Sequence, residues 1–265
     1  MKRILLTVEY DGSTYAGWQR QLNGLAVQQV LEEALSRACG ETITVTGASR
    51  TDAGVHALGQ AVHFDTASSI PPDKFPFVLN TMLPRDIRVH TGREVPPQFH
   101  ARFMTRGKKY TYRMVNSRHG SAIRRNTHLH VPLPLDDSAM ARAAQTLLGQ
   151  HDFAAFQASG GTAKTTVRTM KRTSLARMND ELLFQIEGDA FLYNMVRIMV
   201  GTLVEIGLHR RGENAFDQAF RTLDRLCLGV TAPPHGLELT QVYYPDEAFL
   251  SPEVIRWHKE PLEHD

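Results

Sequence analysis

Cysteine is scarce in this sequence. The 265-residue chain contains only Cys39 and Cys227. These residues lie far apart and match no metal-ligand or redox spacing, which argues against a disulfide framework. Such usage is typical of the reducing cytoplasm, where we expect the protein to act.

Long hydrophobic runs are also missing. The apolar run near the start ends at Glu9 and is shorter than the roughly 7–15 residues of a secretion signal. The stretch 190–208 approaches membrane-spanning length, but Arg197 and Glu205 would be costly at a bilayer centre. We interpret it as a buried helix and predict no membrane association.

Acidic residues are absent from two segments of a chain whose net charge is only +2. No Asp or Glu lies in 95–135 or 153–179. The basic residues there are Arg102, Arg106, Lys108, Lys109, Arg113, Arg118, Arg124, Arg125, Lys164, Arg168, Lys171, Arg172 and Arg177. Segregated positive charge suits a polyanion-binding face, although a solvated face without a ligand also fits.

Strand and helix patterns alternate, in an order that repeats in outline. The predicted strands cover 4–10, 42–46, 60–65, 87–95, 109–116, 167–177, 182–187 and 237–243. The predicted helices cover 27–38, 73–82, 140–148, 190–208 and 215–226. We predict an α+β fold of two similar RRM-like or ferredoxin-like domains, 1–105 and 106–265. Each has a mostly antiparallel sheet flanked by helices, and an active-site cleft lies between them.

A polar loop, 47–59, separates two predicted strands and contains an acid two residues after a base. Asp52 can simply close a turn with Gly54 by bonding its own backbone. Alternatively, an ionised aspartate in a cleft, kept charged by a cation such as Arg50, can act as a nucleophile or stabilise a positive sugar ring. The residues alone leave both interpretations open.

Aromatic and basic residues alternate in 108–113. Tyr110 and Tyr112 fall on one face of the predicted strand. Rings interleaved with cations suit nucleic acid, because stacking on a base contributes about 1–3 kcal/mol. The same alternation also describes the core face of a strand, and we expect one of the two tyrosines to be core.

The helix predicted over 190–208 carries a narrow polar stripe. Arg197 lies on it, and position i+4 is Gly201, which cannot pair with it. Unless Arg197 points to solvent, it needs a partner from elsewhere, such as a distant carboxylate. Gly201 would let another backbone approach.

Cofactor and metal signals are weak. His128 and His130 share a strand face, but no third ligand has a convincing spacing. Ser159-Gly160-Gly161 followed by Lys164 lacks the spacing of a phosphate-binding loop. We expect the chemistry to use side chains alone, with no cofactor and no metal.

Several motifs in a fixed order resemble those of the tRNA pseudouridine synthase A family, over about Ile4 to Pro245. They are Glu9-Tyr10-Asp11-Gly12-Ser13, Gly17-Trp18-Gln19-Arg20-Gln21, Arg50-Thr51-Asp52-Ala53-Gly54-Val55-His56-Ala57, Phe99-His100-Ala101-Arg102, Lys109-Tyr110-Thr111-Tyr112, Gly149-Gln150-His151-Asp152-Phe153, Tyr193-Asn194-Met195-Val196-Arg197 and Thr231-Ala232-Pro233-Pro234-His235-Gly236-Leu237. Ser49 departs from the pattern, because the family usually has glycine there.

The resemblance implies conversion of uridine to pseudouridine at positions 38, 39 and 40 of the tRNA anticodon stem-loop, without a cofactor. It implies that Asp52 is the nucleophile and leaves open whether the family attacks the sugar, attacks the base or promotes elimination. Arg197 matches the basic residue paired with that aspartate, and Tyr110 matches a tyrosine against the uracil that can move the C5 proton. Arg50 matches an arginine that helps expel the base from its stack, and the family is a homodimer.

Two other functions fit parts of the pattern. A non-catalytic RNA-binding α+β protein would explain the bases and tyrosines, and a hydrolase using Asp52 and another acid would release free uracil. In any RNA-binding function, the candidate contact residues are Arg102, Lys108, Lys109, Arg168 and Lys171.

Overall fold

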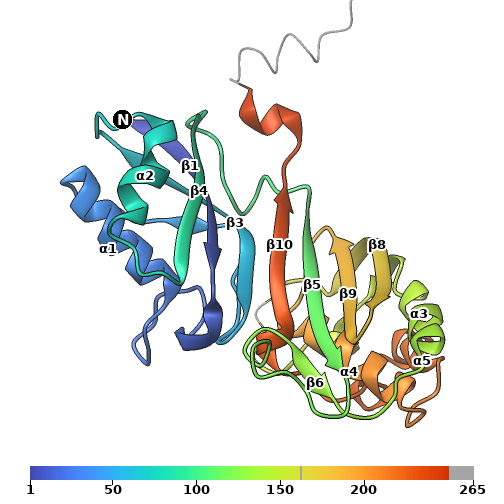
Figure 1. Ribbon diagram of the computed structural model, residues 1–265. Helices are drawn as coiled ribbons and strands as arrows, with labels where there is room; N and C mark the ends of the chain where they lie inside the picture. The colour runs from blue at the N-terminus through green and yellow to red at the C-terminus, as the bar shows by residue number, and fades with distance from the viewer. Residues whose placement is uncertain (162, 251–265) are drawn as a thin grey trace, which may run out of the picture.

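A single mixed sheet runs through the computed structural model, which describes residues 1–161 and 163–250 (Figure 1). Within those residues the strands are β1 (Lys2–Tyr10), β2 (Thr46–Gly47), β3 (His56–Thr66), β4 (Ile87–Val95), β5 (Gly107–Asn116), β6 (Leu129–Val131), β7 (Gly149–Asp152), β8 (Val167–Met178), β9 (Glu181–Gly188) and β10 (Leu237–Tyr243). The α-helices are α1 (Val27–Cys39), α2 (Phe75–Asn80), α3 (Asp137–Gln145), α4 (Met195–Gly207) and α5 (Ala215–Thr222). The predicted α+β class, with a mostly antiparallel sheet, is confirmed.

The last strand joins the two halves of the chain. The strand order is β4-β1-β3-β10-β5-β9-β8-β7, with β2 on β3 and β6 on β5. β10 pairs parallel with β3 at His56 and Ala57, and antiparallel with residues 107–112 of β5. In Figure 1, α1 and α2 lie on the side of the molecule formed by β4, β1 and β3. Helices α3, α4 and α5 lie on the side formed by β5, β9 and β8. The domain boundary at residues 105 and 106 stays a prediction.

The core follows from the alternation in the sequence. Ile4, Leu6 and Val8 of β1 point to one face and are fully buried, where they join Leu31 and Leu35 of α1 in one cluster. Full burial of such a side chain contributes about 1.5–3 kcal/mol. This packing fixes the register of β1, because a shift of the strand by one residue would turn its apolar side chains to the opposite face of the sheet.

The predicted strand over 42–46 is wrong except at its end. Only Thr46 and the following glycine pair with β3. The amide of Ile43 instead donates to Ser36 Oγ at 2.9 Å, and the amide of Val45 donates to Glu32 Oε1 at 3.1 Å. Side chains of α1 thus satisfy the backbone groups that a neighbouring strand would otherwise satisfy.

The two helices predicted near the C-terminus are shorter than expected. α4 begins at Met195 rather than at residue 190, because Asn194 adopts a left-handed conformation with φ of 60°. α5 ends at Thr222, where Leu223 turns left-handed with φ of 56°. Apolar periodicity continues through both turns, so the sequence pattern alone overextends the helices.

No helix in the described parts of the chain combines the length and the apolar character that crossing a bilayer requires. The stretch 190–208 therefore forms the buried helix α4 and the turn before it, with Ile198, Val200 and Leu203 in the core.

Candidate functional site

The loop that carries Asp52 is held in place by the segment between β1 and α1. Thr51 accepts a hydrogen bond from the Trp18 amide at 3.1 Å through its carbonyl, and its hydroxyl lies 2.7 Å from Tyr10 Oη. Gly17 has φ of +93°, and a Cβ there would come within 2.6 Å of the Thr51 carbonyl oxygen. The motif containing Gly17 and Trp18 therefore positions Asp52, a role that sequence reasoning did not identify.

Arg197 reaches Asp52 from the other half of the chain. Its Nη1 lies 3.1 Å from Asp52 Oδ2 and 2.7 Å from Asn194 Oδ1. Its Nε donates to the Ala232 carbonyl at 2.7 Å. These contacts leave the guanidinium little freedom, so the carboxylate meets a fixed cation. Asp52 is therefore the distant carboxylate that we considered as a partner for Arg197.

Asp52 remains accessible although it is paired. The Asp52 side chain keeps 24% of its surface exposed, and Arg197 keeps 16%. Burial raises the pKa of Asp52 above its ordinary value, while the hydrogen bond and the charge of Arg197 act in the opposite direction. The pairing therefore favours the ionised, nucleophilic form at a site that burial alone would tend to neutralise.

Arg50 is not the cation that contacts Asp52. Its side chain is exposed, and it forms no side-chain hydrogen bond or ion pair with the described residues. The sequence hypothesis that Arg50 helps keep Asp52 charged is replaced by the observed contact with Arg197. A role for Arg50 in expelling a base stays a prediction.

Tyr110 and Tyr112 share one face of β5, as predicted, and both are buried. Tyr112 is a core residue whose hydroxyl donates to the Pro233 carbonyl at 2.7 Å. The Tyr110 hydroxyl lies 2.9 Å from Ser49 Oγ. Burial raises the pKa of Tyr110 to about 12, and the charge of Asp52 adds to the rise.

The close approach expected at Gly201 is confirmed. A Cβ at this position would lie 1.7 Å from the Val230 carbonyl oxygen. The same segment is tied to α4 by the Ala232 amide, which donates to the Arg197 carbonyl at 3.0 Å. Gly201 therefore lets the chain that binds the Arg197 guanidinium lie directly on the helix.

His56 links the two halves directly after the Asp52 loop. The Gly12 amide donates to its Nδ1 at 3.1 Å, and its Nε2 lies 3.0 Å from the Asn126 carbonyl and 3.1 Å from that of His235. The Asp11 Oδ1 atom also lies 3.1 Å from Nδ1, so the ring is contacted from both halves of the chain. The motif contained this histidine, but no local signal revealed its partners.

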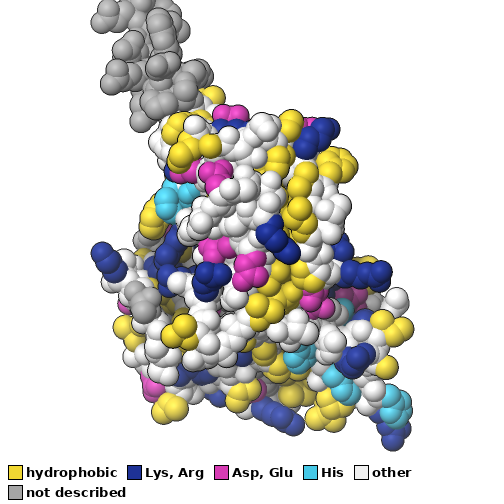
Figure 2. All heavy atoms as spheres, turned by 90° about the vertical axis from the view of Figure 1, so that its left-hand side faces the viewer, with side chains coloured by type: hydrophobic (Ala, Val, Ile, Leu, Met, Phe, Trp, Pro, Cys, Tyr) yellow, Lys and Arg dark blue, Asp and Glu magenta, His cyan; other side chains and the backbone are white. Residues whose placement is uncertain are grey.

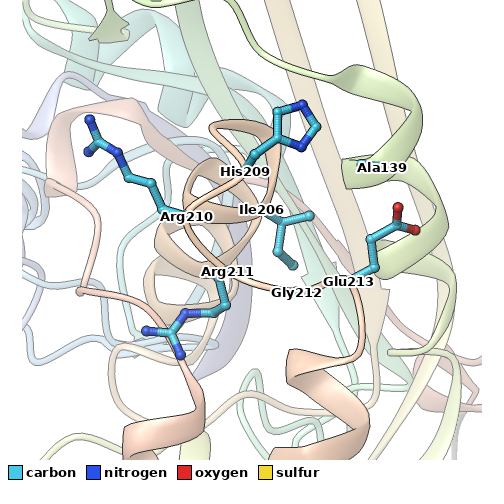
Figure 3. Close-up of a pocket in the computed structure, with 7 residues that line it drawn as sticks. All are labelled: Ala139, Ile206, His209, Arg210, Arg211, Gly212 and Glu213. Atoms are coloured by element: carbon cyan, nitrogen blue, oxygen red, sulfur yellow. The ribbon is translucent and has the colours of Figure 1, made fainter.

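A hollow of about 320 Å³ lies between the halves beside His56, but Asp52 does not line it. Its lining residues are Glu9, Tyr10, Asp11, His56, Ala57, Leu58, Arg113, Thr127, His128, Gly236 and Glu238. A second hollow of about 400 Å³ lies at the end of α4, where Figure 3 shows Arg210 and Arg211 pointing away from Glu213. Asp52 is not part of it either.

The basic candidates for RNA contact occupy different environments. Arg102 and Lys171 are exposed. Lys109 is half-buried and, one residue from Tyr110, projects from the opposite face of β5. Arg168 is half-buried, and its Nη1 donates to the Val167 carbonyl at 2.6 Å. On the face that carries α1 and α2, acidic and basic side chains are intermingled (Figure 2).

Lys108 differs from the other basic candidates. It is half-buried on the Tyr110 face of β5, with its Nζ 3.4 Å from Ser49 Oγ. Burial lowers its pKa to about 8, and the charge of Arg102 adds to the effect. Lys108 is therefore not a freely exposed cation.

The histidines set aside as metal ligands have other partners. His128 Nε2 lies 2.9 Å from Glu181 Oε1, and His130 Nε2 lies 2.7 Å from the Ser117 carbonyl. Among the described residues, no group of three or more His, Cys, Asp or Glu side chains is arranged to hold a metal ion.

Comparison with known proteins relates most of the chain to one enzyme family. A family model described as tRNA pseudouridine synthase matches residues 6–104 and 143–245. Proteins named tRNA pseudouridine synthase A are 47% identical in Ruminiclostridium cellulolyticum and 48% identical in Acetivibrio thermocellus, each over 92% of this chain and 100% of the relative. The one from Halalkalibacterium halodurans is 48% identical over 89% of this chain and 90% of its own length.

Solved structures are more distant. A Cbf5–Nop10–Gar1 complex contains a chain with a TM-score of 0.40 and 11% identity, matched over 96% of this chain and 56% of that one. A TM-score this low carries no argument about fold or function.

Proposed function

Because the chain belongs to the tRNA pseudouridine synthase family, we propose that it isomerises uridine to pseudouridine at positions 38, 39 and 40 of the tRNA anticodon stem-loop, with Asp52 as the nucleophile. The observation that supports this most directly is the contact of Asp52 with Arg197 at 3.1 Å; Tyr110 is a buried phenol whose pKa the charge of Asp52 raises. The site offers an accessible carboxylate, a fixed cation and an aromatic ring.

The reaction requires little else. The bond between uracil N1 and ribose C1′ breaks, the base turns, and a bond forms between C5 and C1′. One proton leaves C5 and one arrives at N1, so no oxidant or reductant is needed. Asp52, kept anionic by Arg197, supplies the nucleophile, and Tyr110 lies against the uracil and moves the proton. Arg50 fills the space that the extruded base leaves, which offsets part of the few kcal/mol that base flipping costs.

Replacement of Asp52 by Asn tests the proposal. We expect Asp52→Asn to bind unmodified tRNA transcript while pseudouridine formation falls by a factor on the order of 10⁴ or more, as for loss of other catalytic nucleophiles. The measurement is pseudouridine mapping after incubation without any added cofactor. Asp73→Asn is the matched control, because Asp73 is an exposed residue that pairs with its neighbour Lys74.

The outcomes separate the alternatives. Unchanged product formation by Asp52→Asn would refute the nucleophile. Binding without any pseudouridine from the wild-type protein would favour the non-catalytic RNA-binding function. Free uracil in the reaction would favour the hydrolase.

Two further properties belong to this proposal. By analogy with its family, we propose that the chain acts as a homodimer, with tRNA lying across both subunits, and that it works in the cytoplasm. Light scattering coupled to size exclusion, with and without tRNA, measures the oligomeric state. A mass of one chain at micromolar concentration would contradict the dimer.

A further inference from the structure

Ser49 connects two titratable side chains that approach the site from β5. Its Oγ lies 2.9 Å from Tyr110 Oη and 3.4 Å from Lys108 Nζ. Lys108 and Tyr110 are two residues apart on one strand, so their side chains project from the same face. The hydroxyl of Ser49 thus completes a chain from an amine through an alcohol to a phenol.

The position of Ser49 is fixed by its backbone. Its amide donates to Gln60 Oε1 at 3.2 Å, and its carbonyl accepts from Gln60 Nε2 at 2.6 Å. Gln60 is fully buried, and Ser49 is 8% exposed. Two hydrogen bonds to one buried amide leave Ser49 little room to move, so the hydroxyl is held between its partners rather than placed there by chance.

Resting on the function proposed above, we propose that Ser49 relays the phenolic proton of Tyr110 to the amine of Lys108, making Lys108 the ultimate acceptor of the proton lost from uracil C5. Ser49 and Lys108 are positioning and relay residues that act through Tyr110.

The proton transfers balance without any further reactant. The neutral amine of Lys108 takes the hydroxyl proton of Ser49, and Ser49 Oγ takes the proton of Tyr110. In the same step the phenolic oxygen accepts the proton from C5, and the electron pair of that C–H bond returns to the uracil ring. The Lys108 ammonium releases one proton to water, and N1 of the base gains one from water. The net change is the C5-to-N1 proton transfer of the isomerisation.

A proton transfer from the phenol to the amine alone is unfavourable, because the phenol has the higher pKa, so the relay moves its protons together with the loss of the proton from C5. Burial lowers the pKa of Lys108 to about 8, with Arg102 contributing, so a sizeable fraction of the amine is neutral near neutral pH. Burial and the charge of Asp52 raise the pKa of Tyr110 to about 12. The phenol alone is therefore a poor source of phenolate. Tyr10 is the other titratable group near the phenol, and it is itself a buried neutral hydroxyl.

A charge-conserving substitution tests the role of Lys108. Arginine at this position retains the positive charge for RNA but cannot lose its proton near neutral pH. We expect Lys108→Arg to bind tRNA normally and to lower the single-turnover rate about tenfold to a hundredfold, with loss of the rate increase near pH 8 that the relay predicts for the wild-type enzyme. Lys74→Arg, at an exposed lysine on the far side of the N-terminal half, is the control.

Removal of the hydroxyl tests Ser49. We expect Ser49→Ala to keep its melting temperature and tRNA affinity, to slow the reaction about tenfold, and to show a larger rate difference between tRNA with hydrogen and tRNA with deuterium at uridine C5. A purely structural role for Ser49 would leave that isotope effect and the pH profile unchanged.

The result that overturns the relay is a Ser49→Ala enzyme with the wild-type rate, pH profile and isotope effect, or a Lys108→Arg enzyme with the wild-type pH profile. Failure of the proposed function looks different, since the wild-type protein would then form no pseudouridine at all.

Discussion

At the scale of residues, the proposed chemistry depends on a single ion pair. Asp52 and Arg197 are separated by 145 positions in the chain, yet their charged atoms lie 3.1 Å apart. Burial and pairing act on the Asp52 pKa in opposite directions. Since a carboxylate must be ionised to act as a nucleophile, Arg197 should determine where on the pH scale the enzyme loses activity.

We predict that Arg197→Gln moves the acidic limb of the pH–rate profile to higher pH. The substitution removes the group that opposes the effect of burial, so Asp52 takes up its proton at a higher pH. Activity at neutral pH should fall about tenfold or more, because breaking a partly buried pair leaves the carboxylate uncompensated. Single-turnover rates across the acidic range measure the limb.

Arg142→Gln removes one member of a surface pair with Glu213 and provides the matched control for that experiment. Its acidic limb should coincide with that of the wild-type enzyme. If the limb of Arg197→Gln also coincided with it, Asp52 would not be the titrating group.

At the scale of elements, α4 and the segment 229–232 form one unit. Gly201 allows the two to touch, the Gly229 amide donates to Thr202 Oγ1 at 2.9 Å, and the Ala232 carbonyl holds the Arg197 guanidinium. The ion pair therefore depends on how closely this segment lies on the helix.

We predict that Gly201→Ala separates α4 from the segment 229–232. A methyl group 1.7 Å from the Val230 carbonyl oxygen forces the backbone away, at a cost of about 1–3 kcal/mol in the free energy of unfolding. We also expect pseudouridine formation to fall about tenfold, because the Ala232 carbonyl moves away from Arg197. Urea denaturation and single-turnover assays measure the two effects.

Gly40→Ala is the comparison for that variant. No atom lies within 4 Å of a Cβ at Gly40, but its φ of +70° makes alanine unfavourable there. This variant should lose about 1 kcal/mol of stability and keep its activity. Equal loss of activity in both variants would mean that general destabilisation, not the displaced segment, is responsible.

At the scale of the whole molecule, positive charge is concentrated in parts of the sequence without forming one uniform surface. Arg102 and Lys171 are exposed, whereas Lys108 is directed toward Ser49. Lys171 also lies near the connection between the halves, because its Nζ donates to the Arg106 carbonyl at 2.7 Å. These two exposed residues are the best placed of the predicted RNA contacts.

We predict that Arg102→Glu and Lys171→Glu each weaken tRNA binding and flatten its salt dependence. Each lost phosphate contact should reduce the slope of log affinity against log salt by about 0.7–0.9. Filter binding or fluorescence titration at several salt concentrations measures the slope. Lys74→Glu, on the α2 side, should leave it unchanged, and an unchanged slope in all three variants would place the RNA elsewhere.

Local pattern determined much of this protein. The sequence predicted β4 over 87–95 and β10 over 237–243 with the observed bounds, because alternation and bounding turn residues are local properties. It also singled out Asp52, Tyr110 and Arg197, and it indicated that Arg197 needed a distant partner unless its side chain faced solvent.

Only the tertiary structure decided what pairs with what. It showed that Arg197, the partner that the resemblance implied, and not Arg50 contacts Asp52, placed Ser49 between Lys108 and Tyr110, and made β10 the strand that joins the halves. These contacts join residues far apart in the chain, and periodicity reports only which face a residue occupies, not what it meets across the core.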